Sequence, residues 1–108
     1  MENNKKVSIM LEEMEENNLV IKTLYNWPRL TEIKCQNIKT LVERNMMLFD
    51  ALMKIKSDIN EKDLKTITES IEFNEAMIKN VSRRNQIQES KRLESLANWA
   101  LNIDKVAY

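Results

Sequence analysis

Apolar residues recur along the whole chain at steps of three and four positions, which is the spacing of one helix face. Sustained period-two alternation and the Gly-containing dipeptides that mark β-hairpins are absent from the sequence. The pattern therefore predicts an all-α protein of two or three long amphipathic helices, forming a helical hairpin or bundle, or a coiled coil. We expect a single helical domain over residues 1–108, with helices at about 6–25, 28–57 and 61–103 and frayed ends at 1–5 and 104–108.

The first predicted break is Trp27-Pro28. Proline lacks a backbone N–H and disrupts a helix interior, but the first position of a helix tolerates it well. One helix is therefore expected to end near Asn26 and the next to start at Pro28. A continuous helix kinked at this proline is the alternative.

The second predicted break lies near Asp58–Asn60. Asp58 with Glu61, or Asn60 with Asp63, has the spacing of a capping box at a helix start. Because the chain has no Gly, we expect a short turn built on Asn or Asp, the available residues that best tolerate the left-handed conformation.

The regular stripes of the second and third segments predict a seam at which helices meet. We interpret this seam as the surface through which the chain joins a second copy or another helical protein. Its members are Ile38, Leu41, Asn45, Leu48, Leu52, Ile55, Leu64, Ile67, Ile71, Ile78 and Val81.

Asparagine interrupts each seam. Asn17 and Asn45 are the only polar residues on the first and second seams, and Asn74 falls on the third. A buried Asn in a coiled coil fixes register and oligomer state while lowering stability, so Asn17 and Asn45 are predicted to set the register. The alternative is that Asn is simply frequent in this composition. If the register role holds, replacing Asn45 by Leu is expected to raise stability and loosen the choice of oligomer.

The third segment is long and contains a polar stretch. A helix of some forty residues spans about 60 Å at about 1.5 Å per residue, so part of it should project beyond a three-helix hairpin. Within it, Ser82–Arg92 has a single apolar residue. This stretch is expected to be either a solvated part of one helix or a frayed interruption.

Four basic residues in this stretch are candidates for an anion contact: Arg83, Arg84, Lys91 and Arg92. A solvated helix face is the simpler interpretation, because no aromatic residues interleave them for base stacking. The chain carries 17 Lys plus Arg and 17 Asp plus Glu, so its formal net charge is zero. Nucleic acid is therefore not expected as the main partner. The acidic cluster Glu12–Glu16 is a possible electrostatic partner for the basic stretch.

The two tryptophans are candidate hot spots for binding, where Trp is enriched. Trp27, beside the proline, is also expected to staple the corner between two helices. Trp99 lies in the part of the third helix that should project, and is as well suited to a partner contact as to capping the core.

The composition excludes most catalytic chemistry. The chain has no Gly for a phosphate-binding loop, no His for a catalytic pair, and one Cys, which is too few for a Cys-rich zinc site. Cys35 is expected to act as a small apolar residue. We expect no enzyme activity, cofactor, metal site or small-molecule substrate.

Location and function follow from these absences and from the seams. No apolar run approaches the roughly 18 residues of a membrane span, and the polar start resembles no signal peptide, so we expect a cytoplasmic protein without membrane insertion. The expected function is a non-enzymatic protein–protein interaction module, an assembly or adaptor subunit that self-associates or joins a larger helical complex. The alternatives are a small phage or viral effector acting on a host protein in the host cytoplasm, and a nucleic-acid-associated helical protein using Arg83–Arg92.

Overall fold

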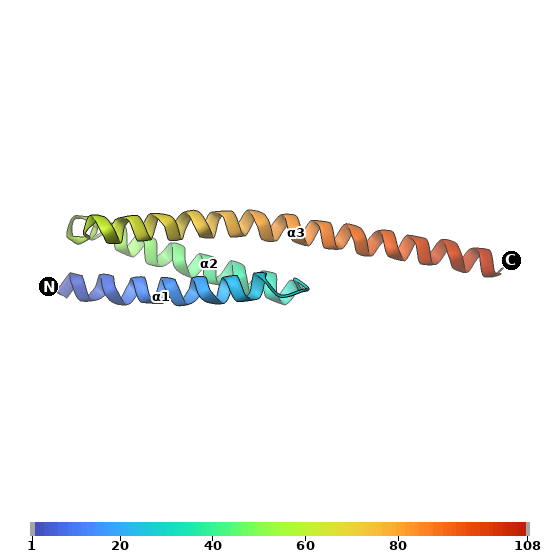
Figure 1. The fold of residues 1–108 in the computed structure, drawn as a ribbon, viewed down its shortest axis with the longest axis horizontal. Coiled ribbons are helices and arrows are strands. Elements are labelled where there is room, and N and C mark those ends of the chain that lie inside the picture. Colours follow the sequence, from blue (N-terminus) through green and yellow to red (C-terminus); the bar gives the residue numbers. More distant parts are fainter. Residues whose placement is uncertain (1, 108) are drawn as a thin grey trace.

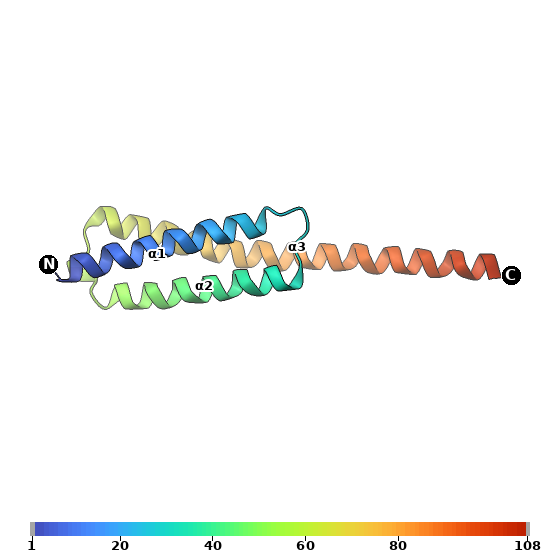
Figure 2. The same ribbon diagram turned by 90° about the horizontal axis from the view of Figure 1, so that it is seen from below.

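The protein is all-α, as the apolar spacing predicted. A computed structural model describes the backbone of residues 2–107 and the side chains of residues 3–99. Its elements are α1 (Glu2–Tyr25), α2 (Glu32–Met53), a short 3-10 turn (Lys56–Asp58) and α3 (Glu61–Ala107). Figures 1 and 2 show α1 and α2 running side by side along the first half of α3, with the second half of α3 continuing alone.

The molecule is a rod with extents of 78 × 17 × 16 Å. Its length is that of α3, whose 47 residues correspond to about 70 Å at about 1.5 Å per residue. The helix runs through Ser82–Arg92 without interruption, so the polar stretch is a solvated part of one helix. The expectation that the third helix outruns the bundle is correct.

The first corner is a loop rather than a tight proline turn. α1 ends at Tyr25 as predicted, but α2 starts at Glu32 and not at Pro28. The reason is the cap: Thr31 has an extended backbone, and its side-chain oxygen accepts a hydrogen bond of 3.2 Å from the backbone N–H of Lys34. Pro28 lies in the loop between the helices.

The chain ends also differ from expectation. α1 already begins at Glu2 and α3 extends to Ala107, so both helices are longer than the predicted 6–25 and 61–103. Met1 and Tyr108 lie outside the described residues. The start of α1 is tied to the 3-10 turn, because the Asn3 side chain donates a hydrogen bond of 2.6 Å to the Asp58 carboxylate.

The second corner uses one of the two predicted capping boxes. Asn60 accepts a hydrogen bond of 2.8 Å from the backbone N–H of Asp63, and its amide donates to the Asp63 carboxylate at 3.1 Å. α2 ends at Met53 rather than near residue 57, because the chain passes into the 3-10 turn. The prediction of an Asn or Asp in the left-handed conformation is wrong, because none of the described residues has a positive φ. The 3-10 turn and the extended backbone of Ile59 reverse the chain instead.

The core consists of two apolar clusters along the rod, each with contributions from all three helices. The cluster next to the second corner is built on Val7, Met14, Leu52, Ile59 and Ile67. The cluster next to the first corner is built on Ile21, Leu30, Cys35, Ile38, Val42 and Val81.

Candidate functional site

The predicted seam lies inside the chain's own bundle. Ile38, Leu52, Ile67 and Val81 are buried, and the remaining apolar members pack partly buried against the two core clusters: Leu41, Leu48, Ile55, Leu64, Ile71 and Ile78. The periodicity identified the correct faces of α2 and α3. Their neighbours in the structure are the other helices of the same chain.

A layer of three asparagines separates the two clusters. Asn17 from α1, Asn45 from α2 and Asn74 from α3 are all buried. We call these three residues the asparagine layer. The structure thus brings together the two residues predicted to set the register and adds Asn74 from the third helix.

Asn45 is the centre of this layer. Its side-chain oxygen accepts a hydrogen bond of 2.8 Å from Asn17, and its amide donates to Asn74 at 3.0 Å and to Asn18 at 2.9 Å. Asn74 in turn donates to Asn18 at 2.9 Å and to the backbone carbonyl of Ser70 at 2.6 Å. One amide side chain therefore links all three helices.

The network satisfies its members. Among the described residues, no buried side-chain nitrogen or oxygen lacks a hydrogen-bond partner. Asn18 and Ser70, which hydrogen bond to each other at 2.8 Å, flank the asparagine layer at its partly exposed edge. Sliding any helix by one turn would place an Asn against Ile or Met, which leaves a buried amide unpaired. The three amides therefore meet at one level of the bundle and hydrogen bond to one another there.

The loop at the first corner is held by α3. The Arg84 guanidinium donates hydrogen bonds to the backbone carbonyls of Tyr25, Trp27 and Pro28, the last two at 2.6 and 3.3 Å. Four residues further along α3, the side-chain amide of Gln88 exchanges two hydrogen bonds with the backbone of one buried loop residue, Leu30 (2.8 and 3.2 Å).

Sequence reasoning missed this role of Arg84 and Gln88. Their spacing of four places them on one helix face. The sequence does show an Arg and a Gln four residues apart in a polar part of the helix, and both side chains can donate hydrogen bonds to backbone carbonyls. Nothing in the sequence tied them to a loop more than fifty residues away.

Trp27 does not staple the corner. Its side chain is 51% exposed, and the Lys34 ammonium lies 4.0 Å from the ring centroid, in a cation–π contact. The residue that anchors the corner in the core is Leu30. Trp27 lies on the outer surface of the loop, at the end of the bundle from which α3 projects.

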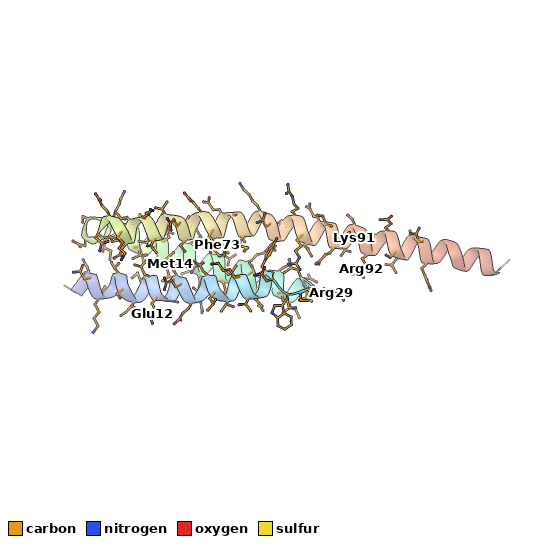
Figure 3. The ribbon with its side chains drawn as sticks, viewed as in Figure 1. Glu12, Met14, Arg29, Phe73, Lys91 and Arg92 are labelled. Atoms are coloured by element: carbon orange, nitrogen blue, oxygen red, sulfur yellow. The ribbon has the colours of Figure 1, made fainter. Side chains whose placement is uncertain are left out.

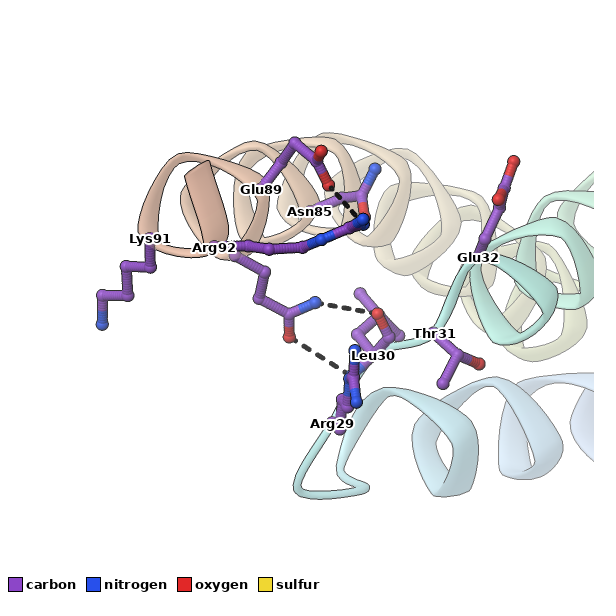
Figure 4. Close-up of a pocket in the computed structure, with 9 residues that line it drawn as sticks. Arg29, Leu30, Thr31, Glu32, Asn85, Glu89, Lys91 and Arg92 are labelled. Carbon is purple, nitrogen blue, oxygen red and sulfur yellow. Dashed lines mark hydrogen bonds and ion pairs between the residues drawn. The ribbon is translucent and has the colours of Figure 1, made fainter. Parts of the chain in front are cut away.

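Three of the four basic residues, Arg83, Arg84 and Lys91, line one hollow beside the first corner. Arg84 is engaged with the loop carbonyls, and Arg92 lies 3.9 Å from Glu89 in an exposed ion pair. A second, open hollow of about 670 Å³ lies between the loop and α3, and Figure 4 shows Arg92 reaching toward Glu89 over it while Lys91 points away. Its charged lining residues are Arg29, Lys91 and Arg92 together with Glu32 and Glu89, so the hollow has a small excess of positive charge.

The acidic cluster Glu12–Glu16 is not paired with the basic stretch within the chain. Glu12 lies in α1 beside the second corner, whereas Lys91 and Arg92 lie beyond the first corner, as Figure 3 shows. Among the described residues the ion pair is Arg92 with Glu89.

The part of α3 beyond the bundle carries unpartnered apolar side chains. Gln88 is the last described residue of α3 that is not exposed, and all side chains of Glu89–Trp99 are exposed. We call Glu89–Trp99 the projecting segment. Within it, Leu93, Leu96 and Trp99 are 58%, 50% and 63% exposed, and we call these three residues the exposed stripe.

The exposed stripe continues the core-facing side of α3. Leu96 lies 18 residues after Ile78, and Trp99 lies 18 residues after the buried Val81. Since 18 residues make five turns at about 3.6 residues per turn, each pair shares a face of the helix. Leu93 flanks this face. The side of α3 that α1 and α2 cover in the bundle is therefore uncovered in the projecting segment.

No group of three or more His, Cys, Asp or Glu side chains among the described residues is arranged to hold a metal ion. Burial raises the pKa of the Cys35 thiol, against the nearby charges of Lys39 and Arg84, which lower it. In the part of the chain that was searched, no helix combines the length and the apolarity needed to cross a bilayer.

Comparisons with protein-family models, with curated proteins and with solved structures found no match to this chain.

Proposed function

We propose that this protein is a non-enzymatic protein–protein interaction module, in which the three-helix bundle is a rigid base and the projecting segment of α3 is the binding element. The observation that carries this proposal is the exposed stripe. Leu93, Leu96 and Trp99 form one face of a helix, and no other part of the described chain covers them.

An unpaired helix with such a face has a high tendency to associate. A helix gains most of its stability from the packing of its apolar face, and an isolated helix of this length is marginal in water. The projecting segment also contains Trp99, a residue type enriched at the centres of interfaces. Occupancy by a partner helix would remove these apolar side chains from water.

The basic residues favour this function over nucleic-acid binding. A nucleic-acid surface needs several cations that are free to meet phosphates. Here Arg84 is hydrogen bonded to the loop and Arg92 lies beside Glu89. Two of the four basic residues are therefore already engaged within the chain, which favours the helix-binding function.

The test compares a stripe variant with a matched control. Leu96→Glu places a charge in the exposed stripe, whereas Asn98→Glu places the same charge about 200° around the helix, away from it. Tagged full-length chains would be expressed in the native cell, and the proteins bound to each, including untagged copies of the chain itself, would be quantified. We expect Leu96→Glu to lose the bound proteins and Asn98→Glu to keep them. Identical recovery by wild type and Leu96→Glu contradicts the proposed function.

A further inference from the structure

We propose that the occupant of the exposed stripe is a second copy of this chain, whose projecting segment pairs with the first in antiparallel orientation. This inference rests on the proposed function and names its partner. The observation that carries it is that the exposed stripe continues the core-facing side of α3. α1 and α2 cover that side only as far as the first corner, where α1 ends and α2 begins.

The ends of α1 and α2 leave a step that a helix can fill. Within the bundle, two helices cover the face of α3 that carries Ile67, Ile78 and Val81. Beyond the first corner the same face bears Leu93, Leu96 and Trp99, with nothing packed on it in the described chain. A helix laid there would extend the existing packing of the bundle along the same line of α3, so the surface is continuous with an interface the protein already uses.

The fold dictates the antiparallel orientation. Figures 1 and 2 show α1 and α2 packed along the first half of α3, and the 18-residue spacing from Ile78 and Val81 places Leu96 and Trp99 on the side of α3 that they cover. A parallel partner packed against the stripe would bring its own α1 and α2 into the space of those of the first copy. In the antiparallel arrangement the two bundles lie at opposite ends of the paired segments.

The sequence pattern selects one register. The a/d spacing of positions 93 and 96 continues at positions 100 and 103 of the same helix. In an antiparallel pair, each a position lies opposite a d position of the partner, so position 93 faces 103 and position 96 faces 100. Each of these two matches occurs twice by symmetry, which gives four layers of facing residues. Shifts by one heptad in either direction leave only two of these layers. The twofold axis then passes near position 98, and the Trp99 side chains of the two copies flank it.

Electrostatics permits this pairing. The chain is neutral overall, so two copies have no net repulsion at long range. In the projecting segment, Arg92 is already beside Glu89 of its own helix. A single two-helix contact is at the small end of specific interfaces, so we expect a dimer in the micromolar range.

The first measurement is sedimentation equilibrium of the purified full-length chain from micromolar to millimolar concentration. We expect a monomer–dimer equilibrium. Leu96→Glu is expected to raise the dissociation constant at least tenfold, because the substituted position occurs twice in a symmetric interface, and Asn98→Glu is expected to leave it within about twofold. Circular dichroism checks that both variants keep the bundle, which is expected because Leu96 belongs to neither core cluster.

The second measurement distinguishes the orientation. Spin labels are placed at Ser90→Cys or Ala97→Cys in a Cys35→Ala background, and distances between copies are measured. These positions are one heptad apart, so a parallel dimer gives equal distances. The antiparallel register separates the labels along the axis by about 24 Å at position 90 and about 3 Å at position 97, at about 1.5 Å per residue.

Three outcomes overturn the proposal: a monomer at every concentration, a dimer that Leu96→Glu leaves unchanged, or equal label distances. A wild-type monomer whose stripe still captures a different protein in the cell would end the self-pairing proposal and leave the proposed function standing. Loss of both would end both.

Discussion

The side-chain amide of Asn45 donates a hydrogen bond to the side-chain oxygen of Asn74, 3.0 Å away in the interior between α2 and α3. Asn17 from α1 donates to the oxygen of the same Asn45 side chain. Asn45 therefore hydrogen bonds to a buried asparagine on each of the other two helices. Its replacement affects two buried partners, whereas an asparagine on a two-helix seam faces one helix.

Replacing Asn45 by Leu is expected to destabilise the protein, which reverses the expectation from the sequence. The substitution leaves the Asn17 amide and the Asn74 oxygen without their partner in a buried position, and such groups carry the full desolvation penalty. We expect the free energy of unfolding to fall by about 2–4 kcal/mol, measured by urea denaturation.

The matched control replaces the whole asparagine layer. With Asn17, Asn45 and Asn74 all changed to Leu, no member of the layer is left as a buried orphan, and the apolar clusters on either side become continuous. We expect this triple variant to be at least as stable as the wild type. A triple variant that loses the sum of the three single effects would contradict the network.

Arg84→Ala is expected to loosen the first corner. Its guanidinium holds the carbonyls of Trp27 and Pro28, and hydrogen bonds to a charged donor contribute about 1.5–3 kcal/mol. We expect a loss of about that size in thermal or urea unfolding. Arg84→Lys should rescue little of it, because an ammonium cannot spread several donors across neighbouring carbonyls. The adjacent, exposed Arg83 is the control, and a loss on Arg83→Ala as large as that of Arg84→Ala would refute the clamp.

Thr31→Ala is expected to shorten α2 at its start. The substitution removes the oxygen that accepts from the Lys34 N–H, and such caps contribute about 0.5–2 kcal/mol. Thr31→Ser keeps the acceptor and should unfold like the wild type. Amide hydrogen exchange at Lys34 reports the cap directly, and unchanged protection in Thr31→Ala would show that the cap is not needed.

The Cys35 thiol is expected to react slowly while the bundle is folded. Burial raises its pKa, so the nucleophilic thiolate is scarcer than in the unfolded chain. Alkylation near neutral pH should be slower in the native protein than in denaturant. The native rate should also rise at higher pH than the unfolded rate, because the raised pKa delays deprotonation. Equal rate profiles in the two states would contradict the buried position.

The helices and their inward faces could be predicted from the sequence, because apolar spacing is local information. The start of α2 could not be, because it depends on a loop held by Arg84 and Gln88 across more than fifty residues. The apolar spacing of the seam residues likewise indicates a buried face and does not tell which helices bury it. Asn74 illustrates the limit, since its place on a seam was visible and its hydrogen bond to Asn45 was not.

The lone continuation of α3 has a consequence for how its helix forms. Helix formation is limited by the first turn, whereas adding residues to an existing helix is nearly neutral in free energy. The bundle holds the first half of α3 in helical form, and so acts as a template from which the projecting segment grows without a nucleation step of its own. A partner therefore meets a segment that is already helical. The orientation of Trp99 around the helix axis is set by residues in the bundle some 30 Å away.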